Sequence, residues 1–277
     1  MSRVLFITGA SSGFGSALAD AALQRGYRVT GTVRQERQVA EFEARAPGQA
    51  KAVCMDVTRP DEVRAGVQAA FMAFGQIDVL VNNAGYALLG AVEEVEDTDI
   101  RRQFETNFFG ALDVTRAVLP SMRERRSGHI VNISSVGGFV GGPGWGFYCA
   151  TKFALEGLSD CLAMEVAPLG IHVTIVEPGA FRTGLGSGGT TKIEPTIPDY
   201  EQTVGKTREW RESSAGREAG DPVKAAAAIL QAVESPAPPL RLVLGADALQ
   251  WVRAKIAQMN QELDRWESVT LDTAYET

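Results

Sequence analysis

Short runs of β-branched and other apolar residues alternate along this chain with longer amphipathic segments. The short runs predict strands at residues 4–8, 28–33, 52–55, 79–81, 130–134, 173–176 and 240–244. The segments between them predict helices at residues 15–25, 36–45, 60–74, 97–125, 145–167 and 221–234. Each such segment is long enough for a right-handed crossover between parallel strands. The alternation therefore predicts a single α/β domain over residues 1–277, with a doubly wound parallel sheet of about seven strands and helices on both faces.

Two later regions, residues 184–220 and 235–239, depart from this alternation, and two C-terminal segments follow the last strand. Residues 184–220 are rich in Gly, Ser, Thr and charge, and they follow the sixth strand at the carboxyl edge of the sheet, where ligands bind in this architecture. We interpret them as a substrate lid; the alternative is a disordered surface insertion. Residues 235–239 form a proline-rich connector, residues 246–267 predict a C-terminal helix, and residues 268–277 predict a mobile tail.

The composition is that of an ordinary globular protein, with 45% hydrophobic and 22% charged residues among 277. The net charge of −7, without a Lys/Arg-rich run, argues against a surface that binds nucleic acid. Only five of the eight residues before the first glycine, Gly9, are apolar, which predicts neither a signal peptide nor a membrane span. We therefore expect a cytoplasmic protein without a membrane partner.

The cysteines and histidines offer little catalytic chemistry. Cys54, Cys149 and Cys161 lack the spacing of metal ligands and are expected to be reduced thiols. His129 and His172 each lie in a predicted strand, so we interpret both as structural. This argues against a zinc centre, and against histidine as the catalytic base.

A glycine-rich turn follows the first predicted strand, in the run Thr8-Gly9-Ala10-Ser11-Ser12-Gly13-Phe14-Gly15. Glycines at these positions allow a tight turn from strand to helix and a close approach of a pyrophosphate to the helix N-terminus. Alone, the run could be any glycine-rich turn. Its position between a strand and a helix favours nucleotide binding.

The end of the second predicted strand carries the residue that should select the dinucleotide. An arginine there would hold a ribose 2′-phosphate, whereas an acidic residue would hold a 2′-hydroxyl. Arg34 lies 19 residues after Gly15, which favours NADP(H), although Arg34 could also be a surface residue paired with Glu36. Asp56, just after the third strand, could contact the adenine or serve as a turn residue.

Tyr148 and Lys152 lie one helical turn apart in a predicted helix. An ammonium at this spacing favours the phenolate and so lowers the pKa of the Tyr148 phenol from its usual value of about 10. If a buried site and a cofactor lower this pKa further, the pair can exchange a proton near neutral pH. Alone, such a pair is more often part of a helix surface. Ser135 ends the fifth strand 13 residues earlier, and Asn107 lies in the middle of a predicted helix, where an asparagine often has a structural partner.

The order of these motifs resembles the short-chain dehydrogenase/reductase family. The motifs are Thr-Gly-x-x-x-Gly-x-Gly, Asn-Asn-Ala-Gly at residues 82–85, the helical Asn107, Ser135, Tyr-x-x-x-Lys and a Pro-Gly turn at residues 178–179. The resemblance extends from about residue 3 to residue 244. Residues 83–90 and 148–158 look like the hydroxysteroid and retinol dehydrogenase branch, which also suggests a ketoreductase-like activity on an apolar carbonyl substrate.

The resemblance implies a Rossmann-type fold and four catalytic residues. Tyr148 would be the acid/base, and Ser135 would fix the carbonyl oxygen. Lys152 would lower the pKa of Tyr148 and bind the nicotinamide ribose, and Asn107 would hold a water that links Lys152 to solvent.

The implied cofactor is NADP(H), with NAD as a weaker alternative because position 12, inside the glycine motif, is Ser rather than a basic residue. Thr183 would orient the nicotinamide. Besides Tyr148 and Lys152, the cofactor contacts that we expect are Gly9, Ser11, Ser12, Gly13, Phe14, Gly15, Arg34, Asp56, Val57, Asn83, Ala84, Gly85, Pro178, Gly179, Phe181 and Thr183.

The leading hypothesis is an NADP(H)-dependent enzyme that interconverts a secondary alcohol and a ketone or aldehyde, on a moderately large apolar small molecule. About half of a set of flanking residues should touch that substrate: Tyr86, Leu88, Leu89, Phe139, Val140, Trp145, Phe147, Phe181 and Leu185. The alternatives are a catalytically silent redox sensor, which the intact catalytic set disfavours, and a nucleotide-sugar epimerase, for which the chain beyond Thr183 is too short.

The sequence also bears on how copies of the chain assemble. The helix that carries Tyr148 has an apolar stripe at Phe153, Ala154, Leu158, Cys161 and Leu162, which is either core or a subunit interface. The resemblance favours a homodimer or homotetramer, although the C-terminal helix could obstruct one tetramer contact.

Overall fold

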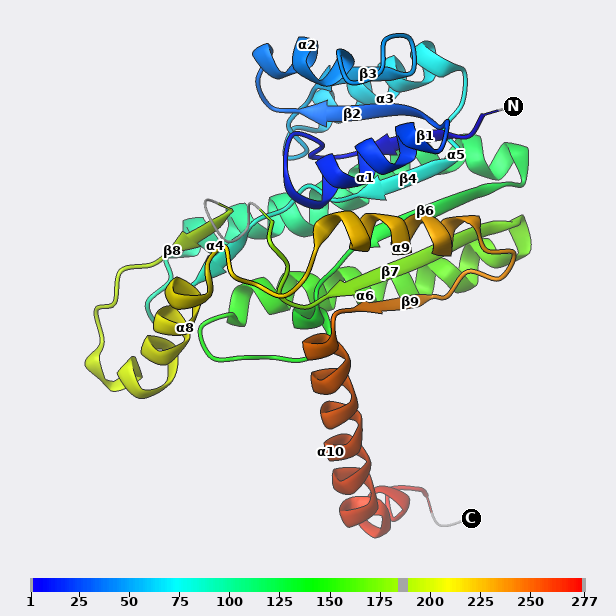
Figure 1. Ribbon diagram of the computed structural model, residues 1–277. Coiled ribbons are helices and arrows are strands. Elements are labelled where there is room, and N and C mark those ends of the chain that lie inside the picture. The colour runs from blue at the N-terminus through cyan, green and yellow to red at the C-terminus, as the bar shows by residue number, and fades with distance from the viewer. Residues whose placement is uncertain (1, 184–188, 276–277) are drawn as a thin grey trace.

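The computed structural model describes residues 2–183 and 189–275 (Figure 1). Its main sheet has seven parallel strands in the order β3-β2-β1-β4-β6-β7-β9, which confirms the predicted fold class. The strands are β1 (Val4–Ile7), β2 (Arg28–Val33), β3 (Ala50–Cys54), β4 (Val79–Asn82), β6 (Gly128–Ile133), β7 (Ile171–Pro178) and β9 (Arg241–Leu244).

Helices cover both faces of this sheet (Figure 1). One layer contains α1 (Gly13–Gln24), α2 (Arg37–Glu43) and α9 (Pro222–Glu234), and the other contains α3 (Pro60–Phe74), α5 (Gly110–Arg125) and α6 (Gly146–Val166). Successive strand residues point to opposite faces, so Leu5 and Ile7 pack in the first layer whereas Phe6 packs in the second. Because both faces are buried, β1 is apolar throughout rather than alternating.

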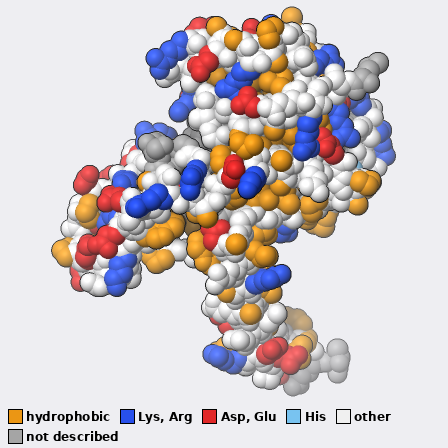
Figure 2. All heavy atoms as spheres, viewed as in Figure 1, with side chains coloured by type: hydrophobic (Ala, Val, Ile, Leu, Met, Phe, Trp, Pro, Cys, Tyr) orange, Lys and Arg blue, Asp and Glu red, His pale blue; other side chains and the backbone are white. Residues whose placement is uncertain are grey.

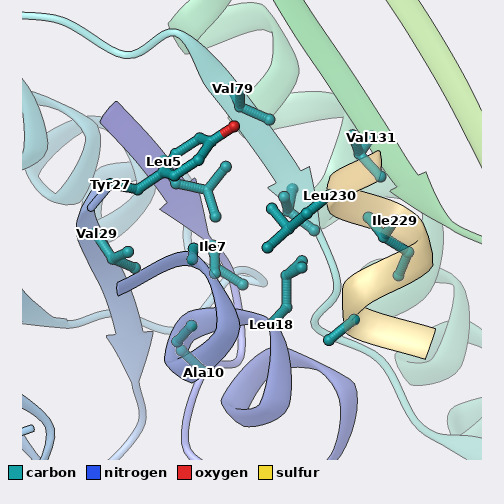
Figure 3. Packing of buried hydrophobic residues seen from close by; sticks show 14 of the residues in the cluster. Leu5, Ile7, Ala10, Leu18, Tyr27, Val29, Val79, Val131, Ile229 and Leu230 are labelled. Atoms are coloured by element: carbon teal, nitrogen blue, oxygen red, sulfur yellow. The ribbon is translucent and has the colours of Figure 1, made fainter. Parts of the chain in front are cut away.

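Figure 3 shows the core of the first layer. Leu5 and Ile7 of β1 lie near Leu18 of α1 and Leu230 of α9, and all four side chains are at most 1% exposed. On the opposite layer, Leu162 of α6 is also in the core. Of the apolar stripe on α6, Phe153 and Cys161 remain exposed, so this stripe is core only in part.

Local signals explain where several helices begin and end. Helix α3 starts with Pro60, which needs no backbone donor in a first turn, and ends at Gly75, whose φ of 81° is left-handed. Helix α9 has Pro222 in its first turn and Asp221 as its N-cap, whose side chain accepts hydrogen bonds from the backbone N–H groups of Val223 and Lys224.

The predicted helix over residues 97–125 is present, but it contains a π-helical turn that the sequence did not reveal. The segment divides into α4 (Asp97–Phe104), a π-helical turn (Glu105–Phe109) and α5. Asn107 lies within the π-helical turn, and its buried side chain hydrogen-bonds to Tyr86 and Thr151 on neighbouring elements. These tertiary hydrogen bonds hold an extra residue in the turn, which sequence periodicity does not reveal.

Residues 189–220 contain secondary structure of their own. Strand β8 (Thr190–Lys192) pairs with β5 (Ala87–Leu89) in a second small sheet. It is followed by a 3₁₀ turn (Pro198–Tyr200), a π-helical turn (Glu201–Gly205) and α8 (Lys206–Ser214). That this region moves as a substrate lid stays a prediction.

The C-terminal helix α10 (Ala246–Leu271) projects from the body of the molecule (Figure 1). It extends four residues beyond the predicted end at Glu267, so the predicted boundary was too early. The mobility of the residues that follow stays a prediction. Among the described residues, no helix combines the length and the hydrophobicity that crossing a bilayer requires.

We predict that Met122→Ala lowers the free energy of unfolding by about 2–5 kcal/mol, because truncation of a fully buried side chain leaves a cavity. Met122 is 0% exposed, whereas Met72 is 80% exposed. Met72→Ala is the matched control and should change stability by less than about 0.5 kcal/mol. Urea unfolding measures both variants, and equal losses would contradict the assigned core.

Candidate active site

A cleft of about 1310 Å³ opens at the carboxyl edge of the sheet. It lies where β1 pairs with β2 on one side and with β4 on the other, which is the point where the strand order reverses. Open α/β sheets bind ligands at such switch points. Its lining includes Gly9, Ser11, Ser12, Gly13, Phe14, Arg34, Asp56, Val57, Asn83, Ala84, Gly85, Ser135, Tyr148, Lys152, Pro178, Gly179, Phe181 and Thr183. Of the predicted site residues, Gly15 and Asn107 do not line it.

The glycine-rich turn brings backbone N–H groups to this cleft. Gly9 and Gly13 have left-handed φ angles of 68° and 56°, which side-chain-bearing residues rarely adopt. Gly15 serves packing instead, because a Cβ there would lie 2.3 Å from the Gly9 carbonyl oxygen. The Ser12 side chain does not cap α1, so the first N–H groups of that helix remain for a ligand. This arrangement suits the pyrophosphate of a dinucleotide.

Thr8 and Asn83 fix the two strand ends that border the cleft. The Thr8 hydroxyl accepts hydrogen bonds from the backbone N–H groups of Asn83 and Ala84, each at 3.0 Å. The Asn83 amide donates to the carbonyl oxygens of Thr8 and Gly9, each at 2.9 Å. The loops after β1 and β4 are therefore locked together before any ligand binds.

Arg34 and Asp56 border the part of the cleft at β2 and β3. Arg34 is exposed and forms no ion pair with any described residue, so the alternative pairing with Glu36 does not occur. Asp56 accepts hydrogen bonds from the Thr58 backbone N–H at 2.9 Å and from its hydroxyl at 2.8 Å. Asp56 is thus a turn residue that also faces the cleft.

Ser135, Tyr148 and Lys152 meet on the opposite wall. The Ser135 hydroxyl accepts a hydrogen bond of 3.0 Å from the Gly137 N–H, which leaves its own proton available to donate. The Lys152 Nζ lies 5.9 Å from the centre of the Tyr148 ring and donates to the Ile133 carbonyl oxygen at 2.8 Å. The end of β6 thereby fixes the lysine beside the tyrosine.

Burial shifts both ionisable groups towards their neutral forms. It raises the pKa of Tyr148 to about 12, an effect that the nearby Ser135 hydroxyl and Arg211 charge only partly offset. Burial also lowers the pKa of Lys152 to about 8, against the opposing effect of Glu156. In the protein alone, desolvation therefore outweighs the lowering of the Tyr148 pKa that the sequence predicts.

Asn107 connects three elements behind this wall. Its amide donates to the Tyr86 carbonyl oxygen at 2.9 Å and to the Thr151 hydroxyl at 3.1 Å, and its Oδ1 accepts from the Tyr86 N–H at 3.1 Å. A Cβ at Gly85 would lie 3.1 Å from Asn107 Oδ1 and 3.8 Å from Lys152 Nζ, so this glycine lies next to both side chains.

A buried acidic group lies one helical turn beyond Lys152. Glu156 accepts a hydrogen bond of 2.6 Å from the Ser134 hydroxyl, and burial raises its pKa to about 7. Arg241 lies between Glu156, Glu177 and Asp160, at 3.8, 3.3 and 2.7 Å. One guanidinium thus balances three carboxyl groups on α6 and β7.

Only part of the apolar set that the sequence led us to expect lines the cleft. Of the flanking residues, Tyr86, Val140, Trp145 and Phe181 line it. Leu88 and Leu89 do not, because the pairing of β5 with β8 buries them, and Phe139 and Phe147 do not line it either. Leu185 lies outside the described residues.

Sequence reasoning missed several lining residues, namely Arg102, Thr106, Lys206, Thr207, Trp210, Arg211 and Trp251. Arg211 is held by an ion pair of 2.9 Å with Glu218. Trp251 belongs to α10 and lies 103 residues after Tyr148, so no local motif connects the two.

A family model described as short chain dehydrogenase matches residues 3–192. Oxidoreductase BOA17 of Botryotinia fuckeliana is 38% identical over 276 residues, which cover 99% of this chain and all of that protein. A 3-ketodihydrosphingosine reductase of Bacteroides thetaiotaomicron is 38% identical over 244 residues, 88% of each chain.

Solved structures agree with this sequence similarity. A short-chain dehydrogenase from Streptomyces avermitilis superposes with a TM-score of 0.92 and 44% identity, covering 99% of both chains. The structure of ElxO with NADP bound superposes with a TM-score of 0.75 and 26% identity, covering 90% of this chain and 100% of ElxO.

The buried Glu156 should make stability depend on pH. Its pKa of about 7 in the folded protein exceeds the value of about 4.3 for an unfolded glutamate, so the folded state binds more protons between these values. We predict that the unfolding free energy falls as pH rises from about 4.5 to 7, and that Glu156→Gln removes a component on the order of 2–3 kcal/mol of this fall. Glu165→Gln, which changes an exposed residue of the same helix, should keep the full pH dependence of the unfolding free energy. Urea unfolding across this pH range measures this free energy. The same pH dependence in both variants would contradict the raised pKa assigned to Glu156.

Proposed function

Because the chain belongs to the short-chain dehydrogenase family, we propose that it is an NADP(H)-dependent oxidoreductase that interconverts a secondary alcohol and a ketone or aldehyde. One observation carries this proposal: Ser135, Tyr148 and Lys152 face the same cleft as the glycine-rich turn at the start of α1. A dinucleotide along that turn would extend towards the tyrosine. When bound, the dinucleotide supplies or accepts the hydride.

Tyr148 and Ser135 act on the reacting oxygen. In reduction, the Tyr148 hydroxyl gives its proton to the carbonyl oxygen, and in oxidation the phenolate takes the proton of the alcohol. Ser135 donates a hydrogen bond to the same oxygen and fixes its position, since the Gly137 N–H engages only one of its two lone pairs and leaves its proton free.

Lys152 and Asn107 support this proton transfer. One Lys152 N–H is used by the Ile133 carbonyl oxygen, and the others remain for the nicotinamide ribose and for a water. The ammonium favours the Tyr148 phenolate. Both N–H groups of the Asn107 side chain are engaged, and the second lone pair of its Oδ1 remains for the water that would link Lys152 to solvent.

The dinucleotide preference rests on Arg34 and on the contacts around Thr183. An exposed arginine without an ion pair at the end of β2 suits a 2′-phosphate, and ElxO, a relative in fold, has NADP bound. NAD is a weaker alternative. Thr183 lines the cleft after β7, a position from which it would orient the nicotinamide carboxamide.

The proposed substrate is a moderately large, mostly apolar alcohol or ketone. Trp145, Trp210 and Trp251 offer apolar surface in the cleft, whereas Lys206 and Arg211 offer charge at the same end. The reductase from Bacteroides thetaiotaomicron acts, by its name, on a 3-keto compound, which supports a ketone. The predicted cytoplasmic location and the predicted homodimer or homotetramer remain predictions.

We predict that Tyr148→Phe lowers kcat about 10²–10⁴-fold, because the variant lacks the proton that the reacting oxygen receives. The dissociation constant for NADPH should change only a few fold. Tyr275→Phe, at a side chain that is 98% exposed, is the control and should retain the rate. NADPH oxidation with a panel of ketones, together with NADPH fluorescence titration, gives both values.

Two outcomes of this experiment count against the proposal. A Tyr148→Phe protein with normal turnover refutes the assigned acid/base. A wild-type protein that binds NADPH but reduces no ketone in the panel, and oxidises no matching alcohol with NADP⁺, supports the silent redox sensor instead.

We predict that Arg34→Gln raises the dissociation constant for NADPH about 10–100-fold, because a charged hydrogen bond to the 2′-phosphate is lost. The dissociation constant for NADH should stay within a few fold. Arg37→Gln is the matched control, since Arg37 is an exposed neighbour that does not line the cleft. An equal loss for NADPH and NADH in Arg34→Gln would contradict the role of Arg34 in selecting the dinucleotide.

A further inference from the structure

Helix α10 leaves most of its surface uncovered. Ala248 is its one buried position among the described residues, and the helix stands away from the body with hydrophobic, basic and acidic side chains exposed (Figures 1 and 2). Leu263 and Trp266, far from the body, are 64% and 59% exposed. Helices in proteins gain most of their stability from packing an apolar face, so this helix lacks the contact that its sequence suits.

The apolar positions form one continuous face. They recur at alternating spacings of three and four residues, which is the heptad pattern of paired helices. We call this face the α10 seam, and it consists of Leu249, Val252, Ile256, Met259, Leu263 and Trp266. At 1.5 Å per residue, the seam is about 27 Å long.

The charges beside the seam divide between the two halves of the helix. Arg253 and Lys255 lie in the first half, where Asp247 adds one negative charge, whereas Glu262, Asp264 and Glu267 lie in the second, where Arg265 adds one positive charge. A partner must therefore be acidic beside the first half and basic beside the second. The same helix in reversed direction has that distribution.

We propose that α10 is a dimerisation helix, which pairs in antiparallel orientation with α10 of a second copy of this chain. The two-fold axis passes between Ala257 and Gln258. In this register every seam residue faces another, with Leu249 opposite Trp266, Val252 opposite Leu263, and Ile256 opposite Met259, each from the other copy.

The flanking charges select this orientation. Lys255 of one copy lies beside Glu262 of the other, and the symmetry repeats the pair. A parallel pair would instead bring Glu262 of one helix beside Glu267 of the other, with like charges. A membrane surface suits the helix less, because its charged residues are four acidic and three basic, whereas interfacial helices are rich in Lys and Arg.

The cleft residue of α10 is not part of the pairing. Trp251 lines the cleft and lies roughly 110° around the helix from the middle of the seam, at 3.6 residues per turn. This inference rests on the geometry of α10 and is independent of the proposed reaction.

The first test breaks the seam. Ile256→Glu combined with Leu263→Glu places charge in the centre of the pairing, and Ala254→Glu combined with Gln261→Glu places the same charge at the same spacing on the opposite face. Sedimentation equilibrium of the full chain should give a twofold lower mass for the seam variant than for the wild type and the control. Circular dichroism establishes that each variant is folded. A seam variant with the wild-type mass would overturn the proposal.

The second test uses charge reversal at the exposed flank. Lys255→Glu and Glu262→Lys should each weaken self-association several-fold at low salt, and the double variant should restore it, since the pair re-forms with reversed signs. Failure of the double variant to restore association rejects the antiparallel register. A wild-type protein that is monomeric and binds vesicles of phosphatidylcholine and phosphatidylglycerol through α10 would also overturn the proposal, in favour of a membrane.

Discussion

The parallel alignment of the seven strands is the constraint on which the rest of the structure depends. Because the strands are parallel, their carboxyl ends all lie at one edge, and the loops that follow β1, β4, β6 and β7 converge there. Gly9, Asn83, Ser135 and Pro178 are far apart in sequence, yet they line one cleft for this reason. The position of this cleft is thus a product of sheet topology.

Helix α6 combines a core role with the chemistry of the site, and this sets its electrostatics. Its burial raises the pKa of Tyr148 to about 12 and lowers that of Lys152 to about 8, so burial makes the charged form of each group less favourable in the protein alone. Positive charge that enters the cleft beside Tyr148 would act against this desolvation. We infer that the low polarity of the wall couples proton transfer at Tyr148 to the bound dinucleotide.

Much of this arrangement was predictable from local patterns, and the remainder depends on contacts between distant segments. Apolar runs predicted the sheet, and the spacing of Tyr148 and Lys152 needed only helical geometry. The π-helical turn around Asn107, the burial of Leu88 by β8, and the approach of Trp251 to the cleft depend on tertiary contacts. Charge pairs such as Arg211 with Glu218 likewise have no signature in the sequence.

The central claim is that Tyr148 becomes an effective base only with oxidised dinucleotide in the cleft. Ultraviolet titration of tyrosine ionisation, taken as the difference between the wild type and Tyr148→Phe, measures this pKa directly. Without dinucleotide, the phenol should remain protonated through alkaline pH, consistent with a pKa of about 12. With saturating NADP⁺, it should ionise several pH units lower. An identical titration in the two conditions would contradict the account.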